Sequence, residues 1–130
     1  MIEQGDILLV PFPFSDQSGT KARSVVVISN NEFNEYSEDT LVIGMASNIS
    51  KGKHTINLTN DDLEEGILST VCCIKVENIL KIENELVIKK IGKIKPSVLA
   101  NISKKLFEII REDQSDNILK KIKKKIIELR

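Results

Sequence analysis

The feature that most constrains this chain is a change of hydrophobic period at Pro96. Before it, short apolar segments rich in β-branched residues alternate with polar, turn-forming stretches, which predicts five or six short strands. The expected strands are residues 6–14, 23–29, 40–47, 54–59, 69–80 and 85–94. Pro96 itself suits the first turn of a helix, and the apolar residues after it repeat at helical spacing through Arg111.

A second apolar stripe predicts one more amphipathic helix from about Asp116 to Arg130. The length of 130 residues, 41% of them hydrophobic, is that of one ordinary domain with a real core. Short strands followed by helices imply a mainly β fold of the α+β class, with a small barrel or rolled sheet and a helix packed against it. We therefore expect a single domain over residues 1–130.

Several local signals refine this expectation. Pro11 and Pro13 limit ladder pairing, so the first strand should end there or run along an edge. Gly44, inside the third strand, indicates a bulge or a close backbone approach. The polar stretch 30–39 is typical of a loop or a short helical turn, and residues 60–66 are typical of a turn or a single helical turn.

Composition excludes several classes of protein. No apolar run approaches the roughly 18 residues of a membrane span, and the N-terminus lacks the layout of a secretory signal, so we expect a cytoplasmic protein. Cys72 and Cys73 are neighbours in a predicted strand, without the spacing of a metal site, and are expected to be reduced core residues. The single histidine, His54, excludes any mechanism that needs two. The sequence thus predicts no metal and no cofactor.

Charge is distributed unevenly along the chain. Up to Ile88 there are 6 Lys and Arg against 14 Asp and Glu, a net charge of −8, and from Lys89 onward 13 against 5, a net charge of +8. Much of the positive excess lies near the C-terminus, in the segment 120–130. Such a run is typical of the solvated face of an amphipathic helix, and contact with a nucleic-acid backbone is the alternative.

Arg23 is the first candidate for a functional side chain. It stands between a polar loop and a strand that can hardly avoid burial, where its stem can pack while its guanidinium reaches an anion. The structural alternative is an ion pair with Asp6 or Asp16. Ser47 and Asn48 end the third strand in a similar way, either as functional groups or as a simple strand end.

Three stretches in order, "GDILLVPFPFSD", "GTKARSVVVIS" and "LVIGMAS", resemble the PemK/MazF family of toxin endoribonucleases over about residues 4–111. The resemblance implies an SH3-like barrel with a packed C-terminal helix, a homodimer, and metal-independent cleavage of single-stranded RNA. It also implies a small, partly disordered antitoxin as partner, with no direct contact to DNA. Arg23 falls on the family's catalytic arginine and Ser47 on its catalytic Thr or Ser. The helix from about residue 116 to 130 extends beyond the usual family length.

Elementary chemistry agrees with this assignment. Metal-free cleavage makes the ribose 2′-hydroxyl attack the adjacent phosphate, which leaves a 2′,3′-cyclic phosphate and a 5′-hydroxyl. Arg23 would clamp the phosphate and Ser47 would donate a hydrogen bond. The residues expected to contact RNA are Lys21, Ser15, Asp16, Asn48 and Phe14.

Two features keep alternatives open. Phe12 and Phe14 share a parity along the first strand, so both face one side of it, which favours core residues over a platform that stacks on bases. Ser24 replaces the proline that usually follows the family's arginine, and the third strand ends Ala46-Ser47-Asn48. The second hypothesis is therefore a binding module on the same barrel, either a toxin without catalysis or one that grips a protein target such as gyrase.

Overall fold

The computed structural model describes residues 1–13, 20–113 and 115–129. Within these ranges the secondary structure is, in chain order, β1 (Asp6–Pro13), β2 (Thr20–Val27), α1 (Asn31–Tyr36), β3 (Asp39–Ala46), β4 (Thr55–Leu58), β5 (Leu63–Glu65), β6 (Cys72–Glu83), β7 (Lys89–Ile94), α2 (Pro96–Ile110) and α3 (Ser115–Glu128). Single 3-10 turns, Asn60–Asp62 and Asn84–Leu86, precede β5 and β7.

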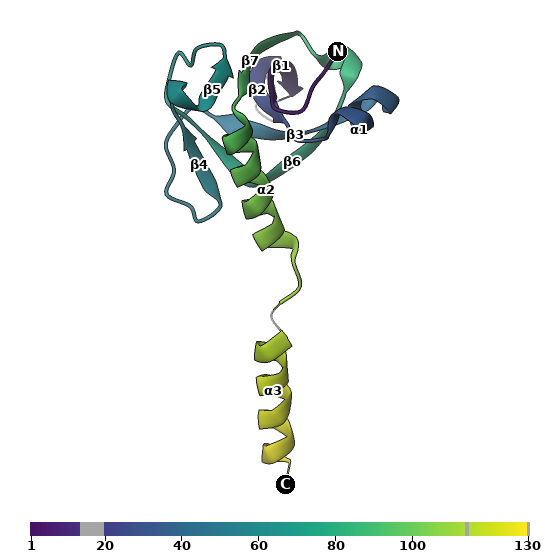
Figure 1. The fold of residues 1–130 in the computed structure, drawn as a ribbon, viewed down its shortest axis with the longest axis vertical. Coiled ribbons are helices and arrows are strands. Elements are labelled where there is room, and N and C mark those ends of the chain that lie inside the picture. Colours follow the sequence, from purple (N-terminus) through teal and green to yellow (C-terminus); the bar gives the residue numbers. More distant parts are fainter. Residues whose placement is uncertain (14–19, 114, 130) are drawn as a thin grey trace.

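The strands form one antiparallel sheet in the order β4-β6-β3-β2-β1-β7-β5. Figure 1 shows this sheet curling on itself, with α2 running across the curl and α3 standing away from it. The prediction of a mainly β fold with C-terminal helices is confirmed. The described strands number seven rather than five or six, because residues 63–65 pair with β7 where the sequence indicated only a turn.

Two apolar clusters fill the two faces of the sheet. The larger one includes Val26 and Ile43 from the sheet together with Val98 and Ile102 from α2. The smaller one gathers Val25 and Val27 with other buried residues of β1 and β3. Because successive strand residues point to opposite faces, one continuous apolar run on β2 serves both clusters. Both cysteines are buried and free, as expected.

The predicted irregularities are found at their expected places. The register between β3 and β6 shifts between Ile43 and Met45, which places Gly44 at the irregularity. β7 pairs with β1 only from Asp6 to Leu9, whereas β2 pairs with β1 through Pro13. The described part of β1 that carries the prolines therefore has one neighbour, which accommodates their missing N–H groups.

Local sequence signals also mark where the helices begin. The side chain of Asn30 caps α1 by accepting a hydrogen bond from the Phe33 N–H at 2.8 Å. Pro96 begins α2, and the second C-terminal helix is α3. None of the described helices is long and apolar enough to cross a membrane.

Candidate active site

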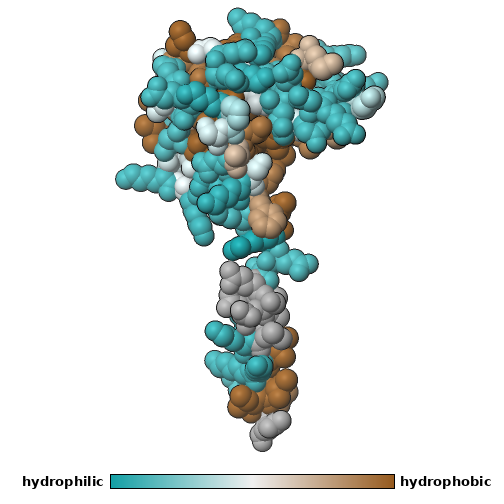
Figure 2. All heavy atoms as spheres, viewed as in Figure 1, coloured by the Kyte–Doolittle hydropathy of each residue, from teal (hydrophilic) through white to brown (hydrophobic). Residues whose placement is uncertain are grey.

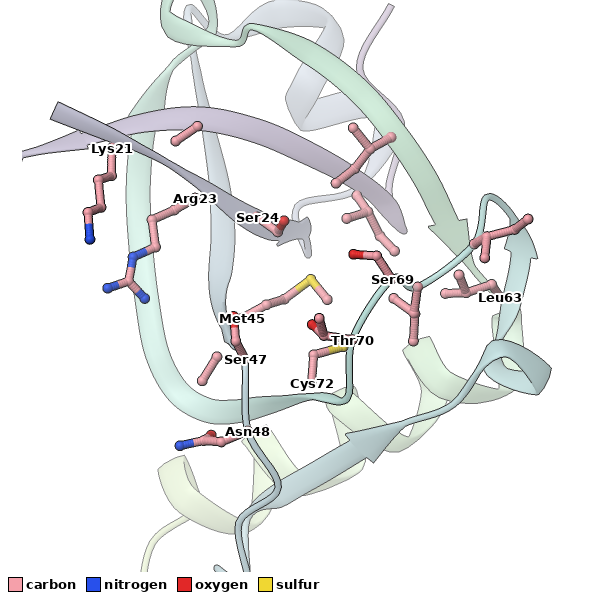
Figure 3. A pocket seen from close by; sticks show the side chains of 16 residues that line it. Lys21, Arg23, Ser24, Met45, Ser47, Asn48, Leu63, Ser69, Thr70 and Cys72 are labelled. Atoms are coloured by element: carbon pink, nitrogen blue, oxygen red, sulfur yellow. The ribbon is translucent and has the colours of Figure 1, made fainter.

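A pocket of about 590 Å³ opens between the ends of β2 and β3 and the segment 67–70. It brings together four predicted site residues: Lys21 and Arg23 from β2, and Ser47 and Asn48 from the segment after β3 (Figure 3). The other predicted RNA contacts, at positions 14–16, lie outside the described residues, and the side chain at position 12 is not described either. Both predicted catalytic residues, Arg23 and Ser47, therefore line the same pocket.

Strand parity places Arg23 at the rim of the pocket, on the face of β2 opposite to that of Ser24. Val25 and Val27 are buried in the smaller core cluster, and Lys21 and Arg23 continue the same face beyond that cluster, where their side chains are exposed. The intervening Ser24 belongs to the opposite face, and Figure 3 shows its hydroxyl turned toward the pocket. A buried strand thus holds a charged side chain at the mouth of the pocket.

Pairing of β2 with β3 brings Arg23 and Ser47 to the same side of the molecule. The register ends where Val25 pairs with Gly44, and the residues just beyond this point on both segments, Arg23 and Ser47, line the same pocket. The side chains of Ser47 and Asn48 are exposed. The buried thiol of Cys73 lies 3.6 Å from Asn48 Oδ1, to which it donates, and so orients the amide. Two adjacent strands therefore deliver a cation, a hydroxyl and an amide to one opening.

The pocket also contains residues that sequence reasoning missed. Ser69 and Thr70 add two hydroxyls, and Figure 3 places Thr70 beside Met45 and Cys72 in the interior of the pocket. Burial raises the pKa of the Cys72 thiol, which keeps it protonated and weakly nucleophilic at neutral pH. No local motif marks Ser69 and Thr70, because their position depends on how the preceding segment meets β7.

That segment is fixed by two glycines. Gly66 has a φ of +89°, and a Cβ on it would lie 2.5 Å from the Ile91 carbonyl oxygen. A Cβ on Gly92 would lie 2.8 Å from the Glu65 carbonyl oxygen. The backbones of β5 and β7 can therefore approach this closely only because both positions lack a side chain. The Leu68 N–H then donates to Asn60 Oδ1 at 2.7 Å, which fixes the wall of the pocket.

Asp6, one of the two alternative ion-pair partners predicted for Arg23, pairs with Lys90. Its buried carboxylate accepts a hydrogen bond from the Glu3 N–H at 2.8 Å and lies 3.3 Å from Lys90 Nζ. Lys90 also lies 3.0 Å from Glu65, and the hydrogen bond to Glu65, followed by the one to Asp6, raises the pKa of Lys90. Arg23 itself pairs with Val10 in the register, well along β1 from Asp6. Asp16, the other alternative partner, lies outside the described residues.

His54 does not line the pocket. Its Nε2 lies 3.7 Å from the Glu108 carboxylate of α2, and Lys105 of α2 donates to the Lys53 carbonyl at 3.2 Å. These contacts attach the turn before β4 to α2. Among the residues that the structure describes, no group of three or more His, Cys, Asp or Glu side chains is arranged to hold a metal ion.

Solved structures of MazF-type toxins have the same fold as this chain. The chain is similar to an endoribonuclease in complex with its cognate antitoxin from a mycobacterial species, with a TM-score of 0.69 and 13% identity over 88% of this chain and 99% of that one. It is similar to the Mycobacterium tuberculosis toxin MazF-mt6, with a TM-score of 0.66 and 14% identity over 84% and 99% of the two chains. It also resembles a MazE-MazF structure from Deinococcus radiodurans, with a TM-score of 0.70 and 15% identity over 86% and 97%.

The sequence itself assigns the family. A model of the PemK-like, MazF-like toxins of type II toxin–antitoxin systems matches residues 3–110, and the chain belongs to this family. No curated protein sequence matches the chain significantly. The matched range ends at the last residue of α2, so α3 lies outside it.

Proposed function

We propose that this protein is a toxin that cleaves single-stranded RNA without a metal ion, with Arg23 and Ser47 as its catalytic residues. The observation that carries the proposal is that these two side chains, one from β2 and one from the segment after β3, are both exposed and line one pocket. Membership of the toxin family and structural likeness to proteins described as endoribonucleases support the same activity.

The proposed reaction is attack of the ribose 2′-hydroxyl on the adjacent phosphorus, with loss of the 5′-oxygen of the next nucleotide. The Arg23 guanidinium offers up to two parallel N–H donors to the non-bridging oxygens, whose negative charge grows in the transition state. The Ser47 hydroxyl donates to the same phosphoryl group. The products are a 2′,3′-cyclic phosphate and a 5′-hydroxyl fragment.

Other residues would bind and orient the RNA. Lys21, on the same face of β2 as Arg23, would contact a neighbouring phosphate, and Asn48, held by the Cys73 thiol, would contact a base or sugar. Ser15, Asp16 and Phe14 lie between β1 and β2 in the sequence, and we propose that they contact the RNA as well. Ser69 and Thr70 add hydroxyl donors on the opposite wall of the pocket.

The proposal includes the expected partners and setting. We propose a cytoplasmic homodimer without direct contact to DNA, neutralised by a small antitoxin, just as the similar mycobacterial endoribonuclease forms a complex with its own cognate antitoxin. Residues 4–111 would form the toxin unit of a single domain over residues 1–130, with residues 116–130 as an added helix. A pure binding module, acting on a protein such as gyrase, would have no need for Arg23 and Ser47 to share an open pocket, so the enzyme is the favoured hypothesis.

The test is an RNA cleavage assay in excess EDTA with the purified protein. Cuts at a recurring short sequence are expected, with 5′ ends that polynucleotide kinase labels without prior phosphatase treatment. Arg23→Ala should abolish them, whereas Arg111→Ala, which removes an exposed arginine outside the pocket, should not. Intact RNA with a folded wild-type protein, or equal cleavage by the two variants, would overturn the proposed function.

A further inference from the structure

α3 is a basic amphipathic helix whose apolar side is uncovered. Ile122 and Ile126 of α3 and Leu129, the residue after its end, recur at spacings of four and three and are 48%, 48% and 86% exposed. Lys121 and Lys125 run along one edge of this stripe, and Figure 2 shows the apolar and the charged sides of the helix separated. Such a helix buries its stripe most favourably against a surface that is both apolar and acidic.

The protein itself carries a surface of that kind on α1. Phe33 and Tyr36 are 42% and 82% exposed there, and with Glu32 they line a hollow of about 440 Å³. Glu35 is exposed on the same short helix. Aromatic side chains and carboxylates therefore lie side by side, complementary to the aliphatic stripe and flanking ammonium groups of α3.

The two surfaces cannot meet within one chain as it is folded. Figure 1 shows α1 at the barrel end of the molecule and α3 directed away at the opposite end, beyond α2. Two chains lying antiparallel, side by side, would bring α3 of each next to α1 of the other. Because both contacts form at once under a two-fold axis, this arrangement closes and does not grow into a filament.

We propose that α3 of one copy docks on the α1 surface of a second copy, making a reciprocal contact between two chains of this protein. The stripe of Ile122, Ile126 and Leu129 would cover Phe33 and Tyr36, and the lysines would pair with Glu32 and Glu35. Pairing of α3 with α3 is disfavoured, because lysines would then face lysines along the seam. The proposal does not rest on the proposed ribonuclease activity.

Two variants, each with two charges reversed, test the contact without disturbing the fold, because all four substituted residues are exposed. The Lys121→Glu/Lys125→Glu variant presents an acidic α3 to an acidic α1, and the Glu32→Lys/Glu35→Lys variant presents a basic α3 to a basic α1. Each variant alone should associate at least about tenfold more weakly than the wild type at low salt, by sedimentation velocity. An equimolar mixture should recover association as a heterodimer, because both of its contacts are again between opposite charges.

The matched control is Lys51→Glu/Lys53→Glu, which reverses two exposed lysines elsewhere and should leave the wild-type association unchanged. Dimers formed through the barrel would not produce recovery on mixing, so that result is specific to the α3–α1 contact. Unchanged self-association of both charge-reversed variants, or weakened variants that fail to recover when mixed, would refute the proposal. A wild-type chain that stays monomeric at low salt would also refute it.

Discussion

Substitution of Gly66 by alanine should destabilise the protein and deform its pocket. The backbone at Gly66 has a φ of +89°, which costs an L-residue about 1–2 kcal/mol. The added Cβ would lie 2.5 Å from the Ile91 carbonyl oxygen and 2.9 Å from the Gly92 Cα, so β5 and β7 must separate, at a further cost of about 1–2 kcal/mol. The expected loss in the free energy of unfolding is therefore about 2–4 kcal/mol.

Urea unfolding measures this loss directly. With a slope of about 1.5 kcal/mol/M, the midpoint should fall by roughly 1.3–2.7 M. Gly44→Ala is the matched control, because a Cβ on Gly44 meets nothing within 4 Å and its φ is not in the left-handed region, so its midpoint should change by less than about 0.7 M. RNA cleavage by Gly66→Ala should also fall under conditions where the variant is still folded, because residues 67–70 line the pocket. Equal midpoints for the two alanine variants would refute the reasoning from backbone approach.

Three further predictions concern the site, an ion pair and the core. Ser47→Ala should lower the rate of RNA cleavage by roughly 10²-fold, whereas Ser47→Thr, which keeps the hydroxyl, should retain most of the activity; equal loss in both would exclude a role for the hydroxyl. The hydrogen bond and charge of Lys93, 2.7 Å from Glu3, lower the pKa of Glu3, so this pair stabilises the fold at neutral pH and its contribution is lost as the pH falls through the lowered pKa. The midpoint of a side-chain NMR titration of Glu3 should rise in Lys93→Ala, and an unchanged midpoint would contradict the assigned cause. Ile102→Ala should cost about 2–4 kcal/mol in urea unfolding by opening a cavity between α2 and the sheet, and a loss below about 1 kcal/mol would show that α2 packs only loosely.

Local pattern in the sequence determined much of the fold. Alternation and β-branched content located most of the strands, and Pro96 located the start of α2, because these signals depend on neighbouring residues alone. The position of Arg23 followed in the same way: once Val25 and Val27 are buried, the strand period places residue 23 on the same face beyond the core. The motifs in the first half of the chain identified the family for the same reason.

Tertiary structure alone decided how distant segments meet. Leu63–Glu65 is a strand only because β7 pairs with it, and that pairing carries Ser69 and Thr70 to the pocket. The ion pair of Asp6 with Lys90 likewise joins residues far apart in sequence, and no pattern in the sequence predicts it. The physical reason is that two backbones can approach closely only where neither segment carries a side chain in the way, as at Gly66 and Gly92. The hydrophobic period, in contrast, indicates only which face of a single segment is buried.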